Sequence, residues 1–212
     1  MLRSETPDPG ARWMLELQAG DPSAFDRIVQ EYQHVVHNLA YRFTGQRDAT
    51  EDLAQEVFLR VYRAKDRYRP EARFQTWLFR VVYNLCINET RARKLRRMRS
   101  IEAPAPGEEH DATLRESVAD EQLQSPLDRL TGGETARRLR EAMAGLPPQQ
   151  RAALTLYQYR GMSLREIADV LETTDKAVKS LLARARENLR EKLAPYVQPS
   201  PENAPAVPKE TR

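Results

Sequence analysis

Residues 163–193 read SLREIADVLETTDKAVKSLLARARENLREKL, and this stretch decides the fold. Ser163 followed by Glu166 is the pattern of a capping box at a helix start. Apolar residues then recur at helical spacing, interrupted at Thr173 and Thr174, either of which can cap a second helix. Two helices joined by a turn of about three or four residues form a helix-turn-helix, whose second helix enters the major groove of DNA. The stretch therefore predicts a DNA-binding helical hairpin.

The side of the second helix that lies away from its apolar stripe is basic. It carries Lys176, Lys179 and Arg184, together with the small residues Ser180 and Ala183. Hydrophobic spacing alone would fit any helical hairpin, but cations on the exposed face favour a nucleic-acid ligand. We expect this side to face duplex DNA.

A second basic segment, residues 60–99, holds 13 Lys or Arg against 3 Asp or Glu. Aromatic residues lie among these charges: Phe74, Trp77, Phe79 and Tyr83. Cations hold phosphates and exposed rings replace lost base stacking, so the segment suits a nucleic-acid strand with unstacked bases. Trp77, at helical spacing, is more typical of a core residue, whereas Tyr83 with Asn84 and Asn88 is the better candidate for base contact.

Helical spacing runs from residue 74 to about residue 99, after a loop over residues 66–73. The expected buried stripe consists of Trp77, Leu78, Val81, Val82 and Leu85. The more exposed side is expected to carry Thr76, Arg80, Tyr83, Asn84, Ile87, Asn88 and Arg91.

Residues 11–64 also read as helix almost throughout. Asp21 marks a helix start and Gly45 fits the end of that helix. Asp48 with Glu51 has the spacing of a capping box for the next helix.

That next helix carries Asp52, Gln55 and Glu56 away from its apolar stripe. Such a polar patch is usually a solvated helix face, and a protein dock is the sharper hypothesis.

The chain as a whole predicts an all-α fold: two small helical domains joined by a flexible acidic linker, the second with the helix-turn-helix. The expected boundaries are an N-terminal segment at 1–20, a first domain at 21–100, the linker at 101–133, a second domain at 134–194 and a disordered Pro-rich tail at 195–212. Net charge is +3, but residues 101–136 hold 2 basic and 9 acidic residues. Such segregation indicates separate surfaces for separate partners.

Several functional classes are disfavoured. Cys86 is the single cysteine, so no internal disulfide forms, which suits a reducing compartment. No apolar run approaches the roughly 20 residues that span a bilayer, and we expect a cytoplasmic protein. His34 and His37 share a helix face without an evident third ligand. No Gly-rich phosphate loop, His-Glu-x-x-His motif or hydrolytic triad is evident, so we expect no metal, no cofactor and no catalytic activity.

Short sequence motifs in both domains carry a family resemblance. In the first domain they are GDPSAF at 20–25, EDLAQEVF at 51–58 and FQTWLFR at 74–80; in the second they are LPPQQR at 146–151, MSLREIA at 162–168 and VKS at 178–180. In this order they resemble the extracytoplasmic-function (ECF) sigma factors of the sigma-70 family, which are promoter-recognition subunits of RNA polymerase. The resemblance covers about residues 20–99 and 136–193.

The resemblance implies particular partners and site residues. Core polymerase, through its beta-prime clamp helices and beta subunit, would bind Asp52, Gln55 and Glu56. The melted minus-ten promoter element would contact Arg73, Thr76, Arg80, Tyr83, Asn84, Asn88 and Arg91. The duplex minus-thirty-five element would contact Thr174, Lys176, Lys179, Ser180, Ala183, Arg184 and Arg186. An anti-sigma factor is a candidate further partner.

The chain departs from the family pattern at Lys176-Ala177, where Gly-Thr is frequent, at Leu181, where Arg is common, and at Glu172, where the turn often has Gly or Asp. The borrowed minus-thirty-five contacts are therefore the least specific part of the resemblance.

Two other function classes stay open at this point. A stand-alone helix-turn-helix regulator would usually dimerise on a palindrome, and it gives no role to the acidic patch or the linker. An enzyme acting on nucleic acid would need a clustered set of metal-binding carboxylates or histidines, which the sequence does not offer.

Overall fold

The computed structural model describes residues 8–102 and 133–197, and every regular element in these ranges is helical. The first body contains α1 Pro9–Gln18, α2 Ser23–Thr44, α3 Thr50–Arg63, the short 3-10 helix η1 Lys65–Arg67 and α4 Phe74–Glu102. The second contains α6 Gly133–Ala144, α7 Pro148–Arg160, α8 Leu164–Leu171 and α9 Asp175–Val197. The all-α prediction is confirmed for the described residues.

The boundaries of the segments differ from the expected ones at a few places. α1 occupies much of the expected N-terminal segment, and α9 continues through Pro195 to Val197. The expected acidic linker lies outside the described residues except at its ends, which belong to α4 and α6. The expected tail lies outside them beyond residue 197.

Most of the helix ends follow from local chemistry. Gly45 and Gly161 end α2 and α7 in the left-handed conformation, with φ of 72° and 61°, which glycine adopts without steric cost. The capping box of Ser163 and Glu166 is present at the start of α8. At the start of α9 the Ala177 N–H donates to Thr174 Oγ1 at 3.2 Å, so Thr174 is the cap.

The predicted capping box at Asp48 and Glu51 is wrong. α3 begins at Thr50 without a side-chain cap, and the Thr50 hydroxyl donates to the Gln46 carbonyl at 2.6 Å. Asp48 instead lies 3.4 Å from the Arg93 guanidinium on α4. A long-range ion pair has replaced the local bond that the spacing suggested.

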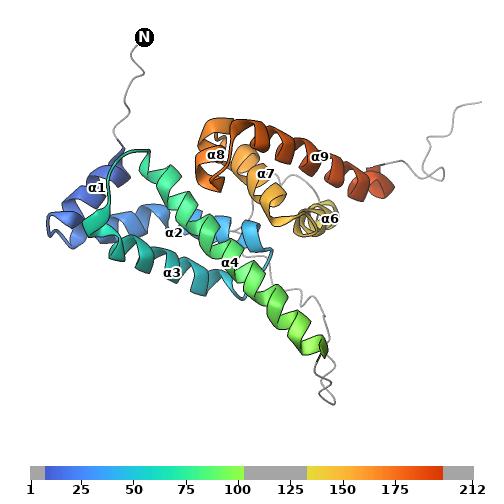
Figure 1. Cartoon of the computed structure of the whole chain (residues 1–212), viewed down its shortest axis with the longest axis horizontal. Coiled ribbons are helices and arrows are strands. Elements are labelled where there is room, and N and C mark those ends of the chain that lie inside the picture. The colour runs from blue at the N-terminus through green and yellow to red at the C-terminus, as the bar shows by residue number, and fades with distance from the viewer. Residues whose placement is uncertain (1–7, 103–132, 198–212) are drawn as a thin grey trace, which may run out of the picture.

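The first body is a helical bundle in which α2 contacts α1, α3 and α4. Its core mixes aromatic side chains with aliphatic ones, and the fully buried aliphatic members include Ile28, Val36, Val57, Val61 and Leu78. Burying each such side chain stabilises the folded state by about 1.5–3 kcal/mol, before the entropic cost of folding is subtracted. The second half of α4 projects beyond the bundle (Figure 1).

The second body packs α7, α8 and α9 around Leu156, Ile167, Val178 and Leu182, which are at most 3% exposed. Glu172 connects α8 to α9 in a left-handed conformation with φ 52°, an unfavourable backbone for a residue with a Cβ. This hairpin is the predicted helix-turn-helix.

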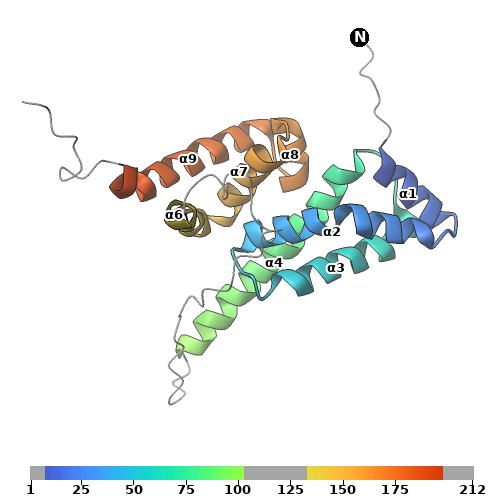
Figure 2. The same ribbon diagram turned by 180° about the vertical axis from the view of Figure 1, so that it is seen from behind.

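The two bodies pack against each other, with α7 on α2 and α8 on α4. In both views α3 and α9 lie on opposite sides of this contact (Figures 1 and 2). The contact decides which candidate site residues reach solvent.

Candidate nucleic-acid and protein interfaces

The seven candidate contacts on and before α9 are all exposed: Thr174, Lys176, Lys179, Ser180, Ala183, Arg184 and Arg186. They surround the buried residues Val178, Leu182 and Ala185, which hold α9 on its own domain. The arrangement leaves a cationic helix face open to a duplex ligand.

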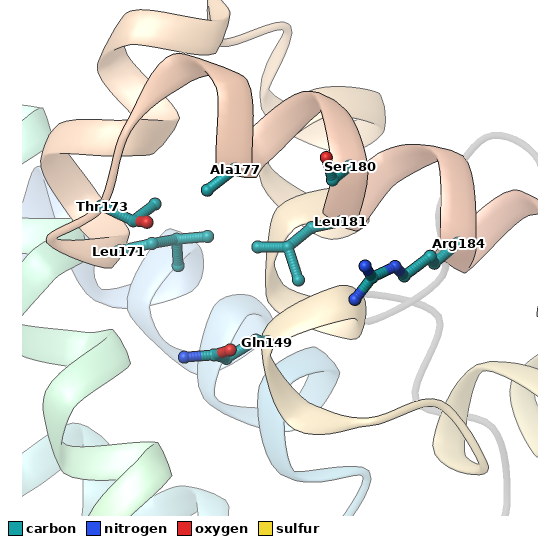
Figure 3. A pocket seen from close by; sticks show the side chains of 7 residues that line it. All are labelled: Gln149, Leu171, Thr173, Ala177, Ser180, Leu181 and Arg184. Carbon is teal, nitrogen blue, oxygen red and sulfur yellow. The ribbon is translucent and has the colours of Figure 1, made fainter.

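One side of that face is hollowed. Leu181 and Arg184 reach from α9 toward Gln149 at the start of α7, across a cavity of about 300 Å³ (Figure 3). Leu181, at the position where the family commonly has Arg, is partly buried in this cavity and exposes no charge. The departure from the family pattern thus places an aliphatic side chain beside the recognition face.

The candidate contacts on and before α4 divide into exposed and buried residues. Arg73, Asn88 and Arg91 are exposed, and Arg80 and Asn84 are half-buried. Thr76 and Tyr83 are 7% and 5% exposed, so the expectation that they lie on an open helix side is wrong for this structure.

The physical reason is a second buried stripe on α4. Phe79, Tyr83 and Cys86 follow Thr76 at helical spacing, and all four are buried. The Tyr83 hydroxyl forms a hydrogen bond with the Gln149 side chain of the second body. Burial raises the pKa of Tyr83. α4 therefore faces its own domain on one side and the second domain on another.

Besides the hydrogen bond of Tyr83 with Gln149, arginine side chains make contacts between the two bodies, and we call the following three of them the clasp. The Arg42 guanidinium lies 3.7 Å from the centre of the Tyr159 ring, and that of Arg160 lies 5.3 Å from the centre of the Phe79 ring. The ion pair Arg73–Glu166 spans 3.8 Å with Arg73 mostly exposed. Cation–π pairs at such sites contribute about 0.5–1 kcal/mol each, and exposed ion pairs about 0–1 kcal/mol. The clasp consists of individually weak interactions.

A buried arginine lies beside the same contact. Arg151 of α7 is 5% exposed, and its Nη1 donates to the Ala144 carbonyl at 2.9 Å. Gly45 ends α2 beside it, where a Cβ would come within 3.4 Å of Nη1. Burial lowers the pKa of Arg151, and burial raises the pKa of the Cys86 thiol to about 12, with the Arg151 charge opposing that rise. Cys86 is consequently a poor nucleophile in this arrangement.

The candidate protein dock on α3 is accessible. Asp52 and Gln55 are exposed, and Glu56 is half-buried with its carboxylate accepting from Arg60 Nε at 2.9 Å. That hydrogen bond is the main cause of the lowered pKa of Glu56.

Two apolar residues on α3 extend this polar patch and were not among the expected dock residues. Leu59 and Tyr62 are 49% and 42% exposed. They follow Asp52 and Gln55 at helical spacing, so they extend one face of α3. Exposed large apolar residues beside a polar patch are typical of a protein interface. Their spacing in the sequence could have revealed them.

Neither a metal centre nor a membrane span is found in the described part of the chain. Among residues 8–102 and 133–197, no three His, Cys, Asp or Glu side chains gather in a group that could hold a metal ion. Over the same residues, no helix combines the length and apolarity that crossing a membrane requires.

Family models match both bodies. Residues 28–96 match Sigma-70 region 2, and residues 136–189 match Sigma-70, region 4. The RNA polymerase sigma-H factor of Pseudomonas aeruginosa is 33% identical over 184 residues, which cover 86% of this chain and 92% of that protein. The ECF RNA polymerase sigma factor SigW of Bacillus subtilis is 33% identical over 178 residues, covering 84% and 93%.

Solved structures share the fold. A structure of CnrH in complex with the cytosolic domain of CnrY has a TM-score of 0.62 at 22% identity and covers 89% of this chain and 99% of that one. The sigma factor RpoE of Bartonella quintana, in complex with the anti-sigma factor NepR, has a TM-score of 0.59 at 21% identity, covering 80% and 96%.

Proposed function

The chain belongs to the ECF group of the sigma-70 family, and from that membership we propose a division of labour among its surfaces. As a sigma factor it binds core RNA polymerase, directs the enzyme to promoters and promotes initiation of transcription. The observation that carries this function is the presence of both matched regions, in order, on one chain.

We assign the polymerase dock to α3. Asp52, Gln55 and Glu56 supply polar contacts for the beta-prime clamp helices, and Leu59 and Tyr62 supply apolar area beside them. The exposure of all but Glu56, which is half-buried, supports this assignment, because a dock must be open before the partner arrives.

We assign capture of the minus-ten element to the loop before α4 and to α4 itself. Arg73, Asn88 and Arg91 are accessible to a strand at once, whereas Tyr83 becomes accessible after α8 leaves α4. The structure described here is therefore proposed to be the closed form of the free factor.

We assign the minus-thirty-five element to the exposed face of α9. Two DNA-binding surfaces on one chain gain avidity when a partner protein fixes the distance between them, and core polymerase is that partner. We further propose that the factor has no catalytic activity of its own and acts in the cytoplasm, where core polymerase transcribes.

Transcription by core polymerase with and without the protein tests the function. With the protein, run-off transcription of genomic fragments from the source organism should give discrete start sites that core polymerase alone does not give. Asp52→Arg should abolish both these products and co-elution with core polymerase, whereas Asp26→Arg, the same charge change at an exposed position of α2, should leave both intact. No promoter-dependent product with the unaltered protein would refute the function.

A further inference from the structure

The helix α1 lies along the loop that joins α3 to α4, and it is bonded to both ends of that loop. At the N-terminal end of α1, Asp8 caps two helices at once. Its Oδ1 accepts from the Ala11 N–H of α1 at 3.1 Å, and its Oδ2 accepts from the Phe74 N–H of α4 at 2.6 Å. Phe74 begins α4, so this bond satisfies one of the first amides of that helix.

At the other end of α1, Gln18 holds the start of the loop. Its Nε2 donates to the carbonyls of Lys65 at 3.0 Å and Asp66 at 3.1 Å, both in η1. The ten residues of α1 thus connect the point where the loop begins with the point where it ends.

α1 is rigidly placed. Met14 and Leu17 are 0% and 3% exposed in the core of the first body. At Gly10 a Cβ would come within 2.2 Å of the Phe74 ring, so α1 approaches the start of α4 as closely as a glycine allows. A loop tied to such a helix at both ends has little freedom to move as a whole.

The loop that α1 holds is cationic and partly aromatic. Arg67, Arg69 and Arg73 are exposed, whereas Tyr68 is buried between Phe74 and Trp77, with ring centres 6.2 and 5.2 Å away. Its exposed guanidinium groups suit the phosphates of a strand. The spacing of these cations depends on where the two ends of the loop are fixed.

We propose that α1 is a brace that positions the loop of residues 65–73 for promoter opening, with Asp8 and Gln18 as its two positioning residues. This inference rests on the proposed role of α4 and its loop in capturing the melted strand. It adds that the N-terminal helix, which contacts neither core polymerase nor DNA in the proposed assignment, sets the efficiency of opening. Asp8 is required as a carboxylate because both of its oxygens accept a backbone N–H, whereas an amide side chain has one acceptor oxygen.

Hydrogen exchange of the free full-length chain tests the structural part. In Asp8→Asn the Phe74 amide or the Ala11 amide loses its acceptor, and in Gln18→Ala the η1 carbonyls lose their donor. We expect exchange at residues 65–75 to rise by about 5-fold or more in both variants, as for loss of a helix cap. Gln30→Ala, an exposed glutamine on α2, is the matched control and should leave this segment unchanged. Unchanged exchange in both variants would overturn the proposal.

Promoter opening by holoenzyme tests the functional part. A promoter found by run-off transcription with the unaltered factor is prepared as duplex and as a heteroduplex already unpaired over the minus-ten element. We expect Asp8→Asn and Gln18→Ala to lower permanganate reactivity and open-complex yield on the duplex by roughly 5-fold. The same variants should lie within about 2-fold of the unaltered factor on the unpaired template, because opening is no longer required.

The outcomes separate this inference from the proposed function. If the unaltered factor initiates and both variants open the duplex normally, the brace is refuted and the sigma function stands. An equal loss on both templates would show a general folding defect and would also overturn a positioning role. Should Asp8→Asn fail to fold, Gln18→Ala alone decides, because it removes no helix cap.

Discussion

The two basic helices that carry the candidate DNA contacts, α4 and α9, are presented in opposite ways. The contacts on α9 are exposed without exception among those we expected. On α4, Thr76 and Tyr83 are buried, and Tyr83 bonds to Gln149 of the other domain. We therefore expect the free chain to offer the exposed face of α9 to duplex DNA at once, whereas Tyr83 on α4 becomes accessible to a melted strand only after the domains separate.

The same difference has an energetic side. α9 is held by apolar residues of its own domain, whereas the contact over α4 includes the weak polar pairs of the clasp. A contact of this kind can be released by the binding energy of a large partner. Variants that alter the DNA contacts of one helix and leave those of the other intact therefore test this difference between α4 and α9. The largest expected effect comes first.

Cys86 reports whether α4 is covered. With its pKa raised to about 12, the thiol at pH 8 holds on the order of a thousandth of the thiolate of an ordinary exposed cysteine. We expect iodoacetamide to modify Cys86 in the free protein roughly a thousand times more slowly than in urea-unfolded protein. Holoenzyme on promoter DNA should react much faster than the free factor. Mass spectrometry of the single cysteine peptide gives both rates, and rapid modification of the free protein would contradict a covered α4.

Arg184 tests whether the exposed face of α9 binds promoter duplex. Reversing its charge in Arg184→Glu removes a cation from the open face of α9 and should weaken binding of holoenzyme to promoter duplex by about 10- to 100-fold. Arg140→Glu, an equal charge change at an exposed position of α6, is the matched control. Binding measured at two salt concentrations separates loss of a specific contact from loss of general attraction. Equal losses in the two variants would remove α9 from the interface.

The clasp variants test whether these contacts keep the second domain packed on α4. Arg42→Ala with Arg160→Ala removes two cation–π pairs, together about 1–2 kcal/mol, and should raise the open population by roughly 5- to 30-fold. The alkylation rate of Cys86 should rise by the same factor. Arg165→Ala, an exposed arginine on α8, should leave the rate unchanged. If the double variant also leaves it unchanged, the clasp does not hold the domains together.

Glu172 gives the smallest expected effect and concerns the turn that leads into α9. Its φ of 52° is costly for a residue with a Cβ, so Glu172→Gly should stabilise the second domain by about 0.5–1 kcal/mol. Glu172→Ala keeps the strained backbone and controls for loss of the carboxylate near Tyr83. Thermal unfolding should show a rise in Tm for the glycine variant, and a lower Tm for glycine than for alanine would contradict the assignment of strain.

The parts of the fold that depend on local chemistry could be predicted from the sequence. The glycine ends of α2 and α7 and the capping box at Ser163 follow from bonds within a few residues. The cap expected at Asp48 failed because its carboxylate meets Arg93, 45 positions away. Local rules carry no information on such a partner.

The candidate sites divide along the same line. The open face of α9 could be predicted because the apolar stripe that fixes its orientation lies within its own hairpin. The burial of Tyr83 could not, because it depends on contact with α7 and α8 across the chain segment that joins the domains. The double cap of Asp8 was equally hidden, since its partner Phe74 lies 66 positions away. Residues whose role is set by a distant partner need the structure.

The distance between the two domains is the measurement that decides whether Tyr83 and its neighbours on α4 become uncovered in the promoter complex. Spin labels at Asp26→Cys on α2 and Asp169→Cys on α8, both exposed positions, can be placed in a Cys86→Ala background. We predict one short distance distribution in the free factor and a clearly longer one in holoenzyme bound to promoter DNA. The same distribution in both states would contradict the account, because α8 would then still cover Tyr83 while the promoter is open.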